Sequence, residues 1–178
     1  MTEMEKMKAG MEYSYADAEL EARKTQAILW CEEYNAIDGR DFEAQYAYLK
    51  KMLGSVGERV WIAKTFCCDC GKNIHIGNDF TGNFNLTILD IREVYIGNHV
   101  MIGPNTLITT VGHPLSPKAR RGYMAHAEPV RIGNDARNQR GQGSRKRKSL
   151  LPSAKRENHR HRRRKNRLCQ RVGAPPQI

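Results

Sequence analysis

Two hydrophobic periods divide the chain. In segment 1–57, apolar residues recur at steps of three and four, which is the period of an amphipathic helix. Three helices are expected: a short one near the N-terminus, a second starting near Asp17 and a third starting at Asp41. Thr2 and Glu5 have the spacing of a capping box, in which each side chain satisfies a free backbone donor at a helix start. This segment is therefore predicted to be helical.

From Val60 the pattern becomes a six-residue repeat of an aliphatic residue, a glycine and polar turn formers. The clear copies start at Ile76, Ile96, Ile102 and Ile132. A period of six fits a flat strand of two or three residues followed by a sharp turn, in which Gly or Asn can adopt positive φ. Three such hexads close one triangular coil. Because one coil cannot bury its own faces, the repeat predicts a stack of coils, which is a parallel β-helix.

The repeat has a limited extent. Coils are expected over residues 58–136, with an irregular excursion at 112–129. Position 138, where the next aliphatic residue is due, holds Asn138. Residues 136–178 contain 15 Lys and Arg and a single acid, which leaves net charges of +14 for that stretch and −3 for the residues before it. The segment 137–178 is thus expected to be a separate, basic tail.

Two explanations compete for this tail. A change of reading frame near codon 136 accounts for the abrupt loss of the repeat and for the reversal of charge. Reading 158–164 one nucleotide later also permits a run that looks like the missing hexads. Alternatively, the tail is a genuine, disordered appendage that binds polyanions through phosphate contacts. It holds no Phe, Trp or Tyr on which bases could stack, so specific nucleic-acid recognition is not expected.

Composition narrows the class of protein. With 39% hydrophobic residues the chain can bury a core, and no apolar run approaches the roughly 18 residues that would cross a membrane. The first residues do not resemble a secretory signal, and five cysteines form no disulfide framework, so a cytoplasmic protein is expected. Cys67, Cys68 and Cys70 suggest a metal site, but adjacent strand residues point to opposite faces and no metal is expected.

Several phrases occur in a fixed order and spacing. They are Lys6–Gly10, Asn73–Gly77, Asn83–Asn85, Ile88–Asp90, Gly112–Leu115 and Pro129–Asp135. In these phrases residues 1–136 resemble the hexapeptide-repeat acetyltransferase family, in its maltose and galactoside O-acetyltransferase branch. The resemblance implies a mainly β fold: a left-handed parallel β-helix behind a short α-helical segment, without the later coils of the family. It also implies a homotrimer with active sites between subunits, and acetyl-CoA as co-substrate.

The resemblance implies roles for four side chains. His113 is the catalytic base, which removes the proton of the acceptor hydroxyl; imidazole suits this task because its pKa lies near working pH. Asn83, Asp90 and Asp69 face the sugar acceptor. Without the resemblance, His113 would be a loop histidine bonded to its own turn, and the other three would be turn and capping residues. His75 is expected to be structural or to lie at a trimer contact.

The function implied is transfer of an acetyl group from acetyl-CoA to a hydroxyl of a sugar such as maltose, glucose or a galactoside. Relatives carry a Trp and a Thr-Lys pair in their later coils, whereas Trp30 and Trp61 both lie upstream here. No CoA-binding residue is therefore assigned, and the chain as written is expected to turn over weakly or not at all. Relatives usually have an aromatic residue at the position of His126, so an acceptor other than a sugar remains open. The alternative from another class is a non-catalytic β-helix fragment with a polyanion-binding tail.

Overall fold

The computed structural model of the protein describes residues 1–138. Residues 139–178, and with them both explanations of the basic tail, lie outside the described residues. Of the predicted tail 137–178, only Arg137 and Asn138 are described, and they pair in parallel with Met101 and Ile102, so the coil extends two residues past its predicted end at 136. The expected helices are present: α1 (Glu3–Lys8), α2 (Ala18–Ala36) and α3 (Phe42–Met52). Each begins after a side-chain cap, because Thr2, Asp17 and Asp41 accept hydrogen bonds from free backbone N–H groups of the first turn. Thr2 and Glu5 form the predicted capping box.

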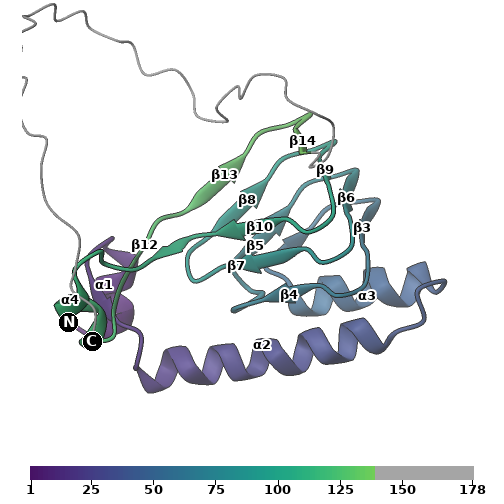
Figure 1. The fold of residues 1–178 in the computed structure, drawn as a ribbon. Coiled ribbons are helices and arrows are strands. Elements are labelled where there is room, and N and C mark those ends of the chain that lie inside the picture. Colours follow the sequence, from purple (N-terminus) through teal and green to yellow (C-terminus); the bar gives the residue numbers. More distant parts are fainter. Residues whose placement is uncertain (139–178) are drawn as a thin grey trace, which may run out of the picture. The chain divides into compact units, whose positions relative to one another are not determined.

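After α3 the chain winds into a three-sided β-helix (Figure 1). Its three faces are parallel sheets, each built from one short strand per coil. The first face holds β2 (Ser55–Val56), β5 (Ile74–Ile76), β8 (Val94–Ile96) and β13 (Val130–Ile132). The second holds β3 (Val60–Ile62), β6 (Phe80–Gly82), β9 (Met101–Ile102) and β14 (Arg137–Asn138). The third holds β4 (Cys67–Cys68), β7 (Thr87–Leu89) and β10 (Leu107–Thr109).

The coils are longer than three hexads. Ile74 pairs with Val94, so one coil takes 20 residues. The second inward-facing positions of successive strands, Ile76, Gly82 and Ile88, are six apart, but the equivalent position of the next strand, Ile96, follows after eight. The prediction of three equal hexads is therefore wrong in its third step. The two additional residues lie where the third face turns into the first, at 69–73 and 90–93, which we call the long corner.

The glycine of the repeated phrase has a reason other than the predicted one. The positive φ angles lie two residues later, for example at Asp79 (57°) and His99 (56°). Gly77 is needed because consecutive coils stack closely: a Cβ there would lie 2.6 Å from Oδ1 of Asn98. That same oxygen accepts a hydrogen bond from Asn78 N–H at 2.8 Å. Close stacking of backbone on asparagine therefore selects the Ile-Gly-Asn sequence.

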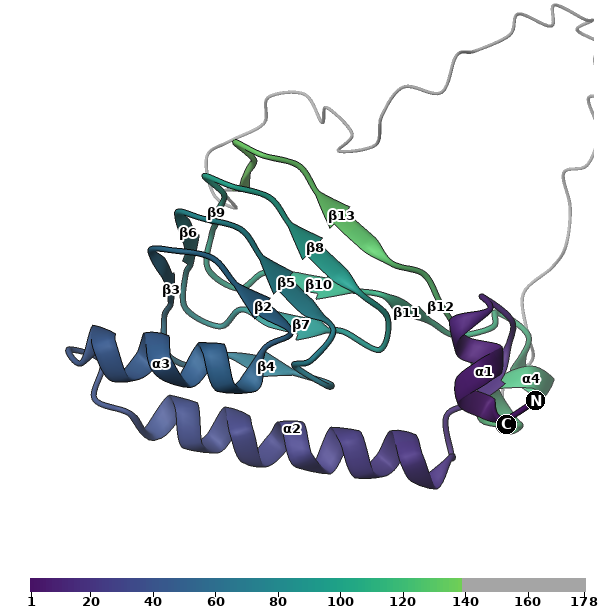
Figure 2. The same cartoon turned by 180° about the vertical axis from the view of Figure 1, so that it is seen from behind.

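Helices α2 and α3 cover the end of the stack beside β3 and β4 (Figures 1 and 2). The first coil has no preceding coil to satisfy its backbone, and an open β edge invites association. Side chains of the two helices take over this role. Tyr34 Oη donates to Ile62 O at 2.6 Å, Asn35 bonds both backbone groups of Phe66, and Tyr46 Oη donates to Gly57 O. The helices thus act as a cap.

Replacing Tyr34 by phenylalanine should destabilise this cap without unfolding the protein. The hydroxyl is buried, and its loss leaves the carbonyl of Ile62 without that donor. We expect the free energy of unfolding to fall by about 1–3 kcal/mol. Urea denaturation followed by circular dichroism measures it. An unchanged midpoint would mean that this hydrogen bond contributes nothing to the cap.

Between β10 and β13 the chain leaves the coil, but it is not irregular there. It forms β11 (Val111–Gly112), α4 (Pro117–Arg121) and β12 (Met124–Ala127). β12 pairs antiparallel with β11 and with β1 (Tyr13–Ser14), a strand that the sequence pattern does not indicate. The prediction of an irregular excursion is wrong because β12 finds a pairing partner in β1, a strand about a hundred residues earlier in the chain. Within residues 1–138 no helix combines the length and the apolar character needed to cross a membrane.

Candidate functional site

His113 follows β11 directly, where the chain leaves the antiparallel sheet. Its Nδ1 lies 3.4 Å from the carbonyl oxygen of Met124 on the paired strand. A carbonyl can only accept, so this contact favours the tautomer with the proton on Nδ1 and leaves Nε2 free to take a proton. Tyr15 holds the ring from one side, edge to face, with 5.3 Å between ring centroids. Backbone and aromatic contacts together orient the imidazole.

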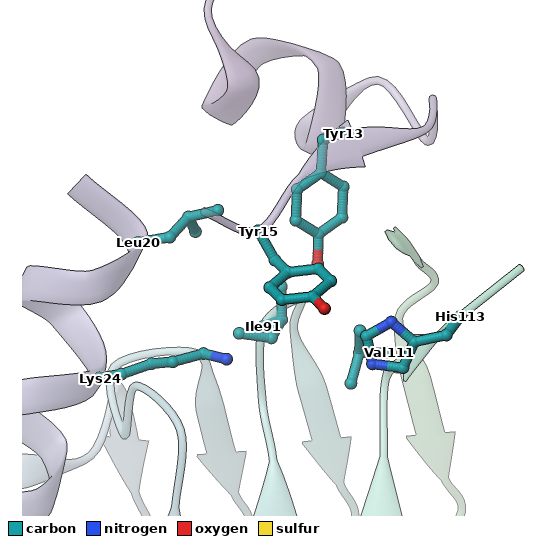
Figure 3. Close-up of a pocket in the computed structure, with 7 residues that line it drawn as sticks. All are labelled: Tyr13, Tyr15, Leu20, Lys24, Ile91, Val111 and His113. Atoms are coloured by element: carbon teal, nitrogen blue, oxygen red, sulfur yellow. The ribbon is translucent and has the colours of Figure 1, made fainter. Parts of the chain in front are cut away.

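The imidazole borders a cavity of about 170 Å³, which we call the His113 pocket (Figure 3). Its walls come from β1, the start of α2, the long corner and β11. The lining residues are Tyr13, Tyr15, Leu20, Lys24, Ile91, Val111 and His113. Most of this lining is apolar or aromatic, with polar groups at a few points. Such a composition is typical of a site that binds a small molecule and orients it by a few hydrogen bonds.

Asp90 lies elsewhere than the resemblance implies. Its side chain is 0% exposed, so it does not face an acceptor in this chain. Oδ1 accepts hydrogen bonds from the N–H groups of Asp69 (3.0 Å) and Cys70 (2.8 Å), one coil earlier. Oδ2 has no partner among the described residues. Burial raises the pKa of this carboxyl to about 7, although the backbone N–H groups oppose the shift. Asp90 therefore joins two turns of the long corner.

The other two predicted acceptor residues do not line the His113 pocket either. Asp69 is half-buried in the long corner, where burial raises the pKa of its carboxyl and Lys24 partly offsets the rise. Asn83 lies at a different corner, between β6 and β7. Its N–H donates to Ile102 O at 3.0 Å, and its Oδ1 accepts from Phe84 N–H at 2.8 Å. Within one chain, therefore, Asp69 lies close to the His113 pocket without lining it, whereas Asn83 lies at another corner of the coil.

The pocket contains residues that the sequence analysis did not select. Tyr13 and Tyr15 are two positions apart in an extended segment, a spacing that directs both side chains to one side. This signal was available, but the segment reads as a connection between helices. Lys24 lies one turn after Leu20 on α2 and carries no pattern of its own. Only the fold brings it to His113.

The remaining candidates have structural surroundings. His75 stacks on Tyr95 of the next coil at 4.9 Å, on the outer side of the first face. His126 is exposed on β12 opposite Gly112, where a Cβ would lie 2.6 Å from its ring. Cys68 is buried with its Sγ 3.6 Å from that of Cys31 on α2, whereas Cys67 is exposed. Within residues 1–138 no group of three or more His, Cys, Asp or Glu side chains could hold a metal ion.

Comparison with known proteins identifies the family. The model described as the maltose acetyltransferase hexapeptide capping motif matches residues 6–57. Nodulation protein L of Rhizobium meliloti (strain 1021) is 41% identical over 132 residues, which cover 74% of this chain and 72% of that protein. The chain belongs to the hexapeptide-repeat acetyltransferases, in their maltose and galactoside branch.

Two solved members of this acetyltransferase family support the same assignment. A galactoside acetyltransferase in complex with coenzyme A superposes with a TM-score of 0.73 at 31% identity, over 77% of this chain and 68% of that one. A maltose O-acetyltransferase from Clostridium difficile 630 gives a TM-score of 0.74 at 31% identity, over 77% and 73%. The predicted fold class, a left-handed parallel β-helix behind short helices, is confirmed. By family the protein is an acyltransferase.

Proposed function

We propose that this acyltransferase moves an acetyl group from acetyl-CoA to a hydroxyl of a sugar such as maltose, glucose or a galactoside. The observation that carries the proposal is the position of His113, which borders the His113 pocket and has Nδ1 directed at the carbonyl of Met124. The solved galactoside acetyltransferase bound to coenzyme A, and the maltose O-acetyltransferase, support the choice of co-substrate and acceptor.

The proposed reaction is a direct attack within a ternary complex. Nε2 of His113 accepts the proton of the acceptor hydroxyl while its oxygen attacks the thioester carbonyl carbon. A C–O bond forms and the C–S bond breaks. The CoA thiolate that leaves then receives from the imidazolium the proton that came from the acceptor hydroxyl. No group becomes oxidised or reduced. The hydrogen bond from Nδ1 to Met124 O stabilises the imidazolium that forms between these steps.

The predicted acceptor residues take different roles in this proposal. Asp69 and Asn83 are half-buried and can still bind an acceptor, whereas Asp90 holds the turn that positions Asp69. Because Asn83 lies at another corner of the coil, it would reach His113 only from a second copy of the chain. A homotrimer with sites between subunits, as the family resemblance implies, would provide that arrangement. The reaction would take place in the cytoplasm, where the free thiols of Cys31 and Cys68 remain reduced.

The direct test is a product analysis with the full chain at high concentration. The protein is incubated with acetyl-CoA carrying a labelled acetyl group and with maltose, glucose, methyl galactoside, a simple primary alcohol or a primary amine. Because only weak turnover is expected of this chain, we expect slow accumulation of label on at least one sugar, and slow release of CoA that depends on that sugar. Label only on the alcohol or the amine would refute the sugar acceptor. Release of CoA without any acetylated product would refute the transfer itself.

A further inference from the structure

Tyr13 presents the His113 pocket with a buried hydroxyl that has no partner. The residue is 1% exposed, yet its Oη forms no hydrogen bond with any described residue. The other fully buried tyrosine behaves differently, because Tyr34 Oη donates to Ile62 O. A buried hydroxyl without a partner is unfavourable, and folded proteins seldom retain one without a reason. Tyr13 lines the His113 pocket, so a ligand bound in that pocket could supply the partner that its hydroxyl lacks.

The ring of Tyr13 is held firmly enough that the hydroxyl cannot turn to solvent. β1 pairs with β12 so that Tyr13 lies opposite Ala125, a small residue that leaves space for the ring. Met7, Leu20 and Ile91 belong to the same buried cluster. Figure 3 shows the hydroxyl end directed away from β1 and toward the side where Tyr15 and His113 lie. The packing therefore fixes the hydroxyl at the edge of the pocket.

The hydroxyl stays protonated at every pH at which the enzyme would work. Burial, together with the nearby groups of Asp69 and Cys70, raises the pKa of Tyr13 to about 12. It is therefore a neutral group that can donate one hydrogen bond and accept another. These are the properties needed to bind an uncharged oxygen atom of a ligand.

We propose that the Tyr13 hydroxyl binds the acceptor by donating a hydrogen bond to a sugar oxygen that neighbours the reacting hydroxyl. This inference rests on the proposed function. It names a class of acceptor: molecules with a second oxygen beside the one that His113 deprotonates. A simple alcohol offers no such oxygen and would leave the buried hydroxyl without a partner, so the site would favour sugars over simple alcohols.

The test uses two isosteric variants with opposite expectations. Tyr13→Phe removes a hydroxyl without a partner, so the stability to urea should equal or exceed that of the wild type. Its dissociation constant for the sugar should rise about tenfold, because the bound oxygen loses its donor. Tyr34→Phe removes a bonded hydroxyl far from the pocket; it should lose stability and keep wild-type affinity. Maltose, glucose and methyl galactoside are titrated without acetyl-CoA, by calorimetry.

Each outcome decides one claim. Equal affinity of the wild type and Tyr13→Phe for a sugar that both bind would overturn the role of Tyr13 and leave the proposed function standing. A loss of stability in Tyr13→Phe as large as in Tyr34→Phe would also overturn it, because the hydroxyl would then have a partner within the protein. If the wild type binds none of the three sugars, the sugar acceptor fails and the role of Tyr13 fails with it.

Discussion

Replacing His113 by alanine should lower kcat for acetyl transfer by about 10²–10⁴-fold, the usual contribution of a positioned general base. The acceptor hydroxyl would then have to lose its proton to water, while the contacts that bind the sugar remain. The pocket is lined mainly by other residues, so KM for the acceptor should change little. The side chain is exposed in the single chain, and the free energy of unfolding should stay within about 0.5 kcal/mol of the wild type.

The matched control is His99→Ala. His99 is also exposed, at a corner of the coil, and its Nδ1 lies 3.2 Å from a carboxylate oxygen of Asp79. It belongs to no part of the pocket, so its loss should leave kcat unchanged. Release of the CoA thiol measures both variants under saturating acetyl-CoA. If His113→Ala retained more than half of the wild-type kcat, a general base at this position would be excluded.

Replacing Asp90 by asparagine should change how the stability of the protein depends on pH. Burial raises the pKa of Asp90 from 3.8 to about 7 in the folded protein. Below pH 3.8 the carboxyl is protonated in both states and contributes nothing to this dependence. Between these values it ionises only in the unfolded chain, so native stability falls as the pH rises. Above pH 7 the loss is complete. The difference between the two pKa values corresponds to a loss of about 4 kcal/mol in the free energy of unfolding.

Asparagine cannot ionise, and its Oδ1 can still accept from the N–H groups of Asp69 and Cys70. The free energy of unfolding of the variant should therefore increase relative to that of the wild type as the pH rises from 4 to 8. Urea denaturation at several pH values would measure this difference. Asp79→Asn is the control of opposite sign. Arg59 lowers the pKa of Asp79, whose stabilisation is present at neutral pH and lost on acidification. If the free energies of unfolding of Asp90→Asn and the wild type differed by the same amount at every pH, the raised pKa of the buried Asp90 carboxyl would be contradicted.

The sequence predicted those elements whose causes are local. Asp17 and Asp41 cap the helices that follow them, and both the cap and the helical period lie within a few residues. The strands of the coil are readable for the same reason. The eight-residue step is not, because the long corner has no fixed turn signal and is held by Asp90 across two coils. β1 escaped prediction because its partner, β12, lies a hundred residues away.

The residues of the candidate site also fall into two groups, those that a local sequence phrase indicates and those that only the fold brings together. His113 could be selected because its neighbours form a recognisable phrase, and Asn83 and Asp69 likewise. The burial of Asp90 could not be foreseen, since carboxylates are expected at the surface and only the stacking of coils covers this one. Tyr13 and Lys24 come to the pocket from β1 and α2. No short pattern in a single segment contains that arrangement.

The long corner also makes the scaffold tolerant of change. Val94 pairs with Val130, so the coil that carries His113 takes 36 residues where its predecessor takes 20. Both flanking faces nevertheless keep their register, because the additional residues leave and re-enter the coil at one corner. The stack thus separates the segment that carries His113, beside its pocket, from the segments that maintain the fold. Insertions and deletions at this corner can change the shape of the His113 pocket while every other coil continues to stack as before.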